Sequence, residues 1–433
     1  DGITEELTDA LGQNAALRVI AWDTASGFRS LGLSAVEIGK RLDVASVLHG
    51  SIERMGDEVR VRAELVDATS GYQLWSAHYD ASFENIFAVQ DRITQAIAAA
   101  LKVKFAKSDL VAGGTRNPKA HELVLKGRAL VNRLDNASLV AAQKDFEEAI
   151  ALDPDYADAH ALLGRALLLQ TEASNQSLGD TRAKVRAEAR RALALDPGNA
   201  DALVELANVD ESELDFARAR EEYRRALALD PGNAAAHLDY STVLPLTQAV
   251  AQAREAVLLD PQNSFAQNNL ATYLLDLGDF EEMLAPAHAI IRLDPRQVDA
   301  AFGLAYAYRQ LHRYDDMVKA FDLVHPQTPL ERRQVEAGRL TYRAAQDATL
   351  RPQALAALNR LRNSEPGPDA QLNLVQLYLA LDEIGQARKL LDEVCPAQPV
   401  DCSDLGVSPI YLPLRDDPGF QALAKKYTTI TRE

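Results

Sequence analysis

Side chains suited to holding a polypeptide recur where a repeated helical pattern would place them on one face. Asparagine and arginine can hydrogen-bond the backbone of an extended peptide or its carboxylate groups. Tyrosine and arginine are among the residues that most often dominate protein interfaces. Tyr306 and Arg309 lie three residues apart, so one helical turn brings them together. The candidate partner-binding residues are Arg165, Asn208, Asn268, Phe302, Tyr306 and Arg309. The alternative is that they are ordinary solvated helix residues.

The chain lacks the motifs of the common enzyme classes. It has no Gly-x-x-x-x-Gly-Lys-Ser/Thr loop, no Gly-x-Gly-x-x-Gly turn, no Gly-x-Ser-x-Gly elbow and no His-Glu-x-x-His helix. Its eight histidines are scattered, and His160 and His237 on predicted helices suit packing better than metal ligation. We therefore expect no enzyme in this chain, with no catalytic, cofactor-binding or metal-binding residues. A hidden active site is the weakest hypothesis.

The two cysteines leave a question of redox state open. Cys395 and Cys402 are separated by six residues and flanked by Pro396 and Pro399. A disulfide between them would close a small loop and suit an oxidising compartment. The alternative is two free thiols in a loop. No histidine lies nearby, so the pair does not predict a zinc site.

Composition narrows the class of protein. The 433 residues are 47% hydrophobic and carry a net charge of −17, divided into −4 before about residue 107 and −13 after it. Neither part shows a basic patch, so nucleic acid is not an expected partner, and an anionic membrane surface would repel the chain. No run of 18 apolar residues predicts a membrane span. The sequence opens Asp1-Gly2-Ile3, which predicts a fragment or processed product with an anchor or effector upstream.

An aspartate–proline pair recurs at nearly regular intervals. The five pairs begin at Asp153, Asp196, Asp230, Asp260 and Asp294, with gaps of 43, 34, 30 and 34 residues. A period near 34 indicates stacked helical hairpins, and proline ends the second helix of each. Small residues recur five positions before the proline at Ala149, Ala192, Ala226 and Ala256, where helices approach closely.

This pattern resembles the tetratricopeptide repeat, a helix–turn–helix of 34 residues. A sixth unit closes at Pro329, and two degenerate units end near Pro366 and Pro399. The 43-residue unit carries extra residues around Thr171–Asp180, and the 30-residue unit has lost about a turn. A short helix within Pro409–Thr428 could cap the stack. In this family the first helices line the concave groove, which places the six candidate residues there.

The first hundred residues predict a small α/β domain. Helices are expected at residues 3–14, after the capping residues Ser34 and Glu37, and over about Ile86–Lys104. Strands are expected at Leu17–Trp22, Ser46–Arg54, Val59–Val66 and Tyr72–Tyr79, the last three as a meander.

The motifs of this region also support a resemblance. Asp1–Leu7, Leu17–Ala21, Val47–Ile52, Val59–Ala68, Gly71–Ser76 and Ile86–Asp91 occur in the order seen in TolB amino-terminal and FlgO-type domains. Such sensor-side domains occur in bacterial adenylate cyclases and winged-helix regulators of the cadaverine-regulator type. The family normally has an apolar strand before this first motif, and this chain begins after it, which would leave a sheet edge open.

We therefore expect a mainly α protein: a small α/β domain with a mixed sheet, then an α-α superhelix of about eight helical hairpins. The expected domains are 1–107, a linker at 108–117, a solenoid at 118–400 and a capping segment at 401–433. The leading hypothesis is a non-enzymatic module that binds a protein or peptide in the concave groove. The resemblance implies the input part of a membrane-anchored bacterial signalling protein, either an adenylate cyclase or a transcriptional regulator.

Two alternatives stay open. A small-molecule or glycan sensor would have its pocket at the domain junction, with Trp22 and Trp75 as residues to watch, although both suit a core. The expected location is the periplasm, tethered to the inner membrane, and the alternative is the cytoplasm. The oligomeric state, the partner and the stimulus are not predicted.

Overall fold

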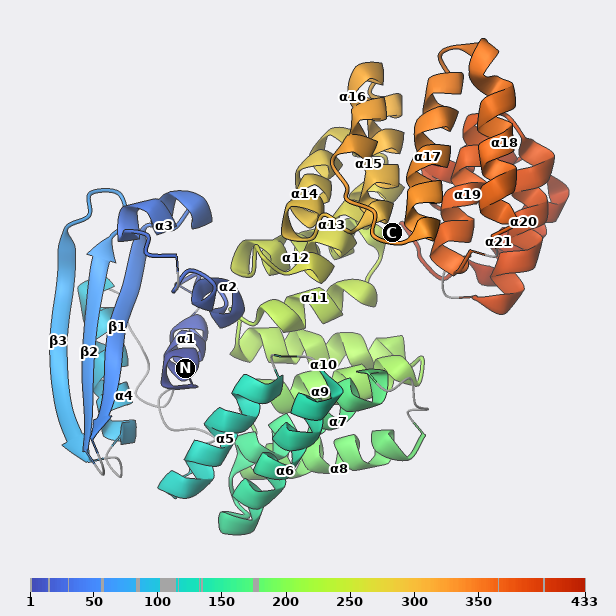
Figure 1. The fold of residues 1–433 in the computed structure, drawn as a ribbon. Coiled ribbons are helices and arrows are strands. Elements are labelled where there is room, and N and C mark those ends of the chain that lie inside the picture. The colour runs from blue at the N-terminus through green and yellow to red at the C-terminus, as the bar shows by residue number, and fades with distance from the viewer. Residues whose placement is uncertain are drawn as a thin grey trace. The chain divides into compact units, whose positions relative to one another are not determined.

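The computed structural model describes residues 2–14, 16–29, 31–55, 58–82, 86–101, 114–115, 117–131, 133, 135–173, 179–364, 366–399 and 402–432. The chain forms two compact units (Figure 1). Unit 1 comprises Asp1–Val243 and Leu258–Pro261, and unit 2 comprises Leu244–Val257 and Gln262–Glu433. The domain boundaries expected from the sequence stay predictions. Most of the expected linker, residues 108–113 and 116, lies outside the described residues.

Unit 1 begins with a small α/β fold. Its elements are α1 (Gly2–Gly12), α2 (Trp22–Ser26), α3 (Ala35–Leu42), β1 (Ser46–Met55), β2 (Glu58–Asp67), β3 (Gln73–Ser82) and α4 (Ile86–Leu101). The strands pair in the order β1-β2-β3, with Val47 opposite Val66 and Val61 opposite Tyr79. Both pairings are antiparallel, so the described sheet is a plain meander and not the mixed sheet that we expected.

The charged–apolar alternation of β2 produces a sheet with one buried face. Val59, Val61, Ala63 and Leu65 share a core with residues of α1 and α4. On the other face Arg60 Nε donates to Asp80 Oδ1 over 2.7 Å. A strand with one dry face requires this two-residue period. The meander predicted from the sequence is therefore confirmed, with α4 covering its apolar face (Figure 1).

A predicted helix start and a predicted strand in this region have opposite outcomes. Ser34 and Glu37 form the expected capping box at the start of α3. The strand expected at Leu17–Trp22 is wrong, because residues 17–21 are irregular and α2 begins at Trp22. A strand forms only where a neighbour completes its backbone hydrogen bonds, and these residues pair with no strand of the described sheet.

Helical hairpins fill the rest of both units, and the paired helices from α5 to α10 and from α13 to α20 contact one another. In unit 1 they are α5 (Pro118–Val131), α6 (Asn136–Leu152), α7 (Ala157–Ala173), α8 (Gly179–Leu195), α9 (Ala200–Ser212), α10 (Phe216–Leu229) and α11 (Ala234–Thr242). The next helix in the chain is α12 (Leu246–Leu259), which the unit boundary crosses. The 30-residue repeat is shorter because its first helix, α11, has only 9 residues. Half of the insertion expected around Thr171–Asp180, residues 174–178, lies outside the described residues.

Unit 2 continues the same pattern. Its further helices are α13 (Ser264–Leu277), α14 (Phe280–Leu293), α15 (Val298–Gln310), α16 (Tyr314–Lys319), α17 (Pro329–Ala344), α18 (Arg351–Arg362), α19 (Pro368–Ala380) and α20 (Ile384–Ala397). Short 3-10 helices cover Ala320–Asp322 (η2) and Ala348–Leu350 (η3). Paired in order from α5 to α20, these helices make eight hairpins, as predicted.

The aspartate–proline turns also start the next helix. In Asp196-Pro-Gly-Asn199, Asp230-Pro-Gly-Asn233 and Asp260-Pro-Gln-Asn263, the asparagine is the N-cap of the first helix that follows. Each asparagine side chain accepts from the backbone N–H three residues on, which satisfies a donor that the helix itself cannot. One short motif thus ends a hairpin and begins the next.

Small residues occur where aromatic rings fill the gap between helices. A Cβ atom at Gly127 would lie 2.4 Å from the Phe146 ring, and one at Gly338 would lie 2.5 Å from the Phe321 ring. Ala149 is fully buried beside the same core as Phe146. The close approach that the repeat pattern predicts is therefore present in both units.

The carboxyl-terminal segment packs onto unit 2. A disulfide joins Cys395 to Cys402, both fully buried, so the disulfide alternative is the one observed. The 3-10 helix η5 (Pro409–Leu414) contacts α13, α19 and α20, and α21 (Pro418–Tyr427) contacts α20. Leu246 N then donates to Thr431 O over 2.8 Å, which holds the last residues against α12. The predicted short terminal helix is confirmed as α21.

Candidate partner-binding surface

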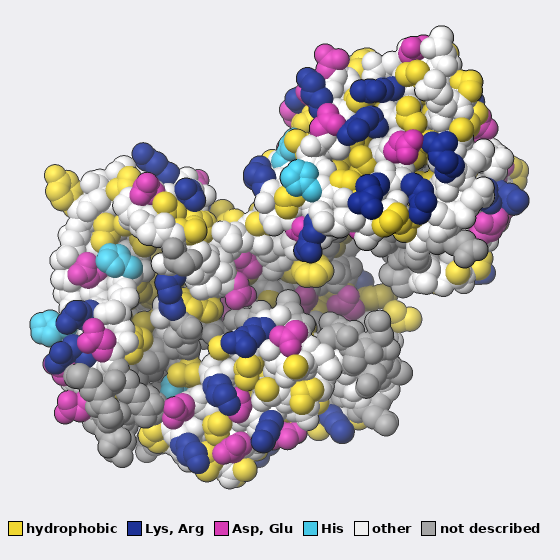
Figure 2. Space-filling view, viewed as in Figure 1, with side chains coloured by type: hydrophobic (Ala, Val, Ile, Leu, Met, Phe, Trp, Pro, Cys, Tyr) yellow, Lys and Arg dark blue, Asp and Glu magenta, His cyan; other side chains and the backbone are white. Residues whose placement is uncertain are grey.

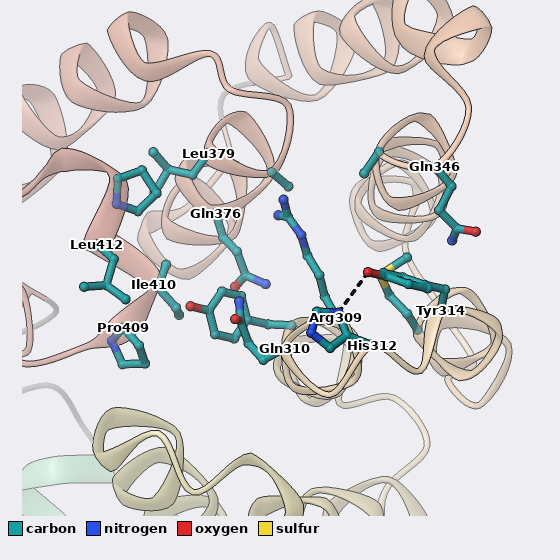
Figure 3. Close-up of a pocket in the computed structure, with 15 residues that line it drawn as sticks. Arg309, Gln310, His312, Tyr314, Gln346, Gln376, Leu379, Pro409, Ile410 and Leu412 are labelled. Atoms are coloured by element: carbon teal, nitrogen blue, oxygen red, sulfur yellow. Dashed lines mark hydrogen bonds between the residues drawn. The ribbon is translucent and has the colours of Figure 1, made fainter.

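A cavity of about 440 Å³ opens in unit 2 among three first helices and the carboxyl-terminal segment (Figure 3). α15, α17 and α19 contact one another, so side chains from the ends of these helices converge. η5 supplies the opposite wall. The polar lining comes from Arg309, Gln310, His312, Gln346 and Gln376, and the apolar wall from Leu379, Pro409, Ile410, Leu412 and Pro413.

Tyr306 and Arg309 both line this cavity from α15. The Tyr306 ring packs edge-on against Phe280 at 5.9 Å between centroids, which fixes the tyrosine side chain. Burial raises the pKa of the Tyr306 phenol, and the Arg309 charge opposes that shift. The phenol therefore stays protonated and available as a hydrogen-bond donor.

Arg309 is a half-buried cation that makes no ion pair or side-chain hydrogen bond within the described part of the chain. Figure 3 shows it extending from α15 into the space bordered by Gln346 and Gln376. Guanidinium groups at such positions suit a carboxylate or a peptide carbonyl. This side chain gives the cavity its preference for negative charge.

The helices that carry the lining are fixed by buried polar contacts. Gln376 Nε2 donates to Tyr342 OH over 2.7 Å and to Phe302 O over 3.1 Å, which ties α19 to α17 and α15. Burial raises the pKa of Tyr342 to about 12. At the rim, His312 Nδ1 and Tyr314 OH lie 3.0 Å apart, the dashed contact of Figure 3. The site is thus held in shape by the protein before any ligand arrives.

The structure does not bring the six predicted residues together. Tyr306 and Arg309 share the cavity, and Asn268 is an exposed residue of α13 outside its lining. The prediction that Phe302 binds the partner is wrong. Its side chain is 1% exposed and packs edge-on against Phe321, so its ring cannot reach a ligand. The prediction failed because each residue along a helix points about 100° away from the one before, so neighbouring positions can face the groove and the core.

The other two predicted residues lie in unit 1. Arg165 Nη1 is 3.9 Å from Glu205 Oε1, and burial raises the pKa of Glu205 to about 8. Asn208 Oδ1 accepts from the buried Tyr223 hydroxyl. Both side chains therefore have partners inside the protein. Neither lines the cavity of unit 2.

Sequence reasoning missed Gln346, Gln376 and the wall formed by η5. The run Pro409-Ile410-Tyr411-Leu412-Pro413 was a usable signal, because it places apolar side chains between two prolines. In the structure Leu412 is 51% exposed. Trp22 and Trp75 line neither described cavity. Trp75 packs against the α/β core, and the Arg29 guanidinium lies 5.3 Å from the Trp22 ring.

The described residues contain no cluster of three or more metal-ligating side chains from histidine, cysteine, aspartate and glutamate. Among the helices that the structure describes, none has the length and apolar character needed to cross a bilayer. These findings concern the described residues alone.

A family model of the tetratricopeptide repeat matches residues 127–174 and 268–329. These two segments are similar in sequence to the tetratricopeptide repeat. The second segment contains α15, with Tyr306 and Arg309. Proteins of this repeat class commonly mediate protein–protein interaction.

One curated relative is "Putative adenylate cyclase 3" of Rhizobium meliloti (strain 1021). It is 32% identical over 184 residues, which cover 42% of this chain and 31% of the relative. The match therefore spans less than a third of that relative's length.

Solved structures of similar proteins include PilF of Pseudomonas aeruginosa, 25% identical, with a TM-score of 0.37, covering 50% of this chain and 95% of PilF. YrrB, described as a repeat protein with an unusual peptide-binding site, is 21% identical with a TM-score of 0.34, covering 41% and 89%. A repeat protein of Parabacteroides merdae is 14% identical with a TM-score of 0.35, covering 71% and 98%.

Proposed function

We propose that this chain is a non-enzymatic binding module whose unit 2 cavity receives a segment of a partner protein. The observation that carries the proposal is Arg309, a half-buried cation without an ion pair in the described residues, placed beside Tyr306 in a cavity of about 440 Å³. A volume in this range holds a few side chains of a ligand. The apolar wall of η5 then contacts apolar side chains of the ligand, and the polar ends of α15, α17 and α19 contact its polar groups.

The chemistry of the lining defines the segment that it takes. Arg309 pairs with a carboxylate, and Gln310 and Gln346 offer amide groups to the backbone of an extended chain. Leu379, Ile410 and Leu412 receive an aliphatic side chain. We expect a ligand with one acidic group and one aliphatic or aromatic residue a few positions away.

Peptide selection tests this proposal directly. A random peptide library displayed on phage is selected on the immobilised protein, and enriched peptides are measured by fluorescence anisotropy. Arg309→Ala should weaken binding at least about tenfold, the cost of losing a charged contact in a desolvated site. Lys389→Ala removes an exposed charge from α20, outside the cavity, and should change nothing. Equal affinity for Arg309→Ala and the unaltered protein would remove the cavity from the account.

The relative named as an adenylate cyclase supports a second, wider proposal. The chain acts as the input part of a larger bacterial signalling protein, with a cyclase or a winged-helix domain as its effector. Stacked repeats are held by nearest-neighbour contacts, so a ligand that prefers one curvature can bias an attached domain. Cyclic AMP formation by a full-length polypeptide containing this chain should change when the selected peptide is added. No change with saturating peptide would separate the binding function from this role.

The disulfide between Cys395 and Cys402 supports a periplasmic location, because oxidising compartments preserve such bonds. Anchoring to the inner membrane belongs to the same proposal. Alkylation of free thiols after acid quenching and denaturation of the cells, so that the two buried cysteines become accessible, followed by mass spectrometry of the 395–402 peptide, tests it. Unmodified cysteines support the periplasm, and quantitative alkylation supports the cytoplasm.

A further inference from the structure

The second helix of the sixth hairpin is cut short. The second helices of the other seven described hairpins span 12 to 17 residues, whereas α16 spans 6 and continues only as the 3-10 turn η2. His325 N donates to Pro295 O over 2.6 Å, and Pro326 follows, so the chain runs on without helix until α17. The second helix of this hairpin is therefore about half the usual length where it lies beside α17.

This gap leaves an open groove of about 510 Å³ between η2 and α17. Its apolar lining comes from Val324, Pro326, Val335 and Leu340. Its charged lining comes from two arginines, Arg332 and Arg339, and two acidic residues, Asp322 and Glu336. Leu323, next to the groove, is 41% exposed. Asp322 pairs with Arg339 and Glu336 with Arg360, so within the described residues Arg332 is the cation of this lining without an ion pair. An apolar groove with such a cation at its edge suits an acidic group beside a projecting aliphatic side chain.

The helices beside the groove are basic, although the whole chain is acidic. Residues 329–364 contain seven arginines, no lysine and three acidic residues, a local charge of +4 in a chain of −17. Figure 2 shows Lys and Arg side chains interleaved with hydrophobic ones on this part of unit 2. The excess was not apparent from the total charge, which led us to expect no basic patch.

Only part of this positive charge is neutralised inside the molecule. Arg339 pairs with Asp322, and Arg360 Nη2 lies 3.0 Å from Glu336 Oε1. Arg332 donates only to a backbone carbonyl, and Arg343 has no ion pair within the described residues. Arg332, Arg339 and Arg343 recur at helical spacing along α17, so Arg343 lies on the same helix face as Arg332 and Arg339, which line the groove.

The turn between α9 and α10 has the complementary character. Residues 201–215 contain six acidic residues and neither lysine nor arginine; Glu205 and Asp210 are buried, whereas Glu213 is exposed and Asp215 half-buried at the turn. Leu214 is 74% exposed in a left-handed conformation with φ of 64°, and Phe216 is 37% exposed. Glu213 and Asp215 meet Arg186 and Arg218 at 3.0 and 4.0 Å, but exposed pairs of this kind contribute little.

We propose that the α16–α17 groove of one copy receives the Glu213–Phe216 turn of a second copy. Leu214 fills the apolar surface of Val324, Val335 and Leu340, and the neighbouring carboxylates meet Arg332 and Arg343. The two surfaces differ, so in a pair one copy uses its groove and the other uses its turn. The first copy then keeps a free turn, and the second keeps a free groove. Association is therefore heterologous and depends on salt.

Sedimentation velocity tests this contact on the whole chain. The unaltered protein should associate as its concentration rises through the micromolar range, and about 0.5 M salt should weaken association relative to about 0.05 M. Leu214→Ser and the double variant Arg332→Glu/Arg343→Glu should each weaken it at least about tenfold, because each removes one half of the contact. Phe265→Ser removes another exposed ring (68% exposed, on α13) and should leave association unchanged.

Mixing gives the decisive result. Leu214→Ser retains an intact groove, and the arginine double variant retains an intact turn, so the mixture should form a discrete one-to-one complex. Circular dichroism confirms that each variant is folded. The proposal is overturned if the unaltered protein stays monomeric, if both variants associate as it does, or if the folded variants fail to combine.

Discussion

Replacing Asp276 with asparagine should change how the stability of unit 2 depends on pH. Asp276 is the penultimate residue of α13 and is fully buried. Neither carboxylate oxygen makes a hydrogen bond of normal geometry within the described residues. The Arg432 side chain donates to the backbone carbonyl of Asp276 over 3.2 Å. A buried carboxylate so placed is costly to ionise.

Two effects raise the pKa of Asp276 to about 8. Burial is the larger, and the charge of Asp404 adds to it, while Ser408 and Arg432 oppose it. Burial likewise raises the pKa of Asp404 to about 6, so the two carboxyl groups titrate as a pair. The buried Tyr411 lies in the same cluster.

The sign of the effect follows from proton uptake. The folded pKa of Asp276 lies above the unfolded value of 3.8, so its contribution is fully present below about pH 4 and is lost as the pH rises to about 8. Between these limits the free energy of unfolding falls by about 1.4 kcal/mol per pH unit for each extra proton bound. Four units set an upper bound of about 5 kcal/mol.

Asparagine cannot ionise, so Asp276→Asn should flatten this slope. Relative to the unaltered protein, the variant should be neutral or slightly less stable near pH 5, because its buried amide lacks a partner. It should be more stable by about 2 to 4 kcal/mol near pH 8. Asp315→Asn, at an exposed position of α16, is the matched control and should leave the slope unchanged.

Hydrogen exchange of the α13 peptide between pH 5 and pH 8 is the assay, after correction for the intrinsic exchange rate. This measurement isolates unit 2 without assuming that the whole chain unfolds in one step. A difference between Asp276→Asn and the unaltered protein that stays constant over this range would show that the carboxyl group is not held protonated.

Three further predictions concern packing, capping and the disulfide. Gly338→Val should destabilise unit 2 by about 1 to 3 kcal/mol, because its Cβ meets the Phe321 ring, whereas Gly385→Ala, with open space around it, should not; urea unfolding compares them. Asn199→Ala should cost about 1 to 2 kcal/mol through loss of the α9 cap, and Asn199→Ser, which keeps a capping oxygen without placing a second carboxylate beside Asp158, should retain most of that cap in the same assay. Cys402→Ser should cost about 2 to 3 kcal/mol, read as faster hydrogen exchange in residues 402–414.

The repeats could be predicted because their signals are local. Each Asp-Pro turn ends a helix through backbone geometry alone, and small residues such as Ala149 fit only where a neighbour is close. The signal for strand β2 was equally local, since its alternation of charged and apolar residues determines which face of the strand is buried. The strand expected at Leu17–Trp22 failed because a strand also depends on a partner elsewhere in the chain.

The candidate site was predictable only in part. Tyr306 and Arg309 share a helix, so their spacing sufficed. Gln376 and η5 enter the cavity through tertiary contacts across more than 60 residues of sequence, which no periodicity encodes. Phe302 failed for a related reason, since the depth of a helix face depends on the ring of Phe321 that covers it.

The measurement that tests the central claim most directly is photocrosslinking from inside the cavity. Benzoylphenylalanine is placed at Gln346, which lines the cavity, or at Lys389, an exposed position outside it, and each protein is irradiated with a selected peptide. We predict a crosslink from position 346 that disappears when Arg309→Ala is added, and none from position 389. Equal crosslinking from both positions, or a crosslink from 346 that is undiminished by Arg309→Ala at the same peptide concentration, would contradict the proposal that this cavity binds the partner.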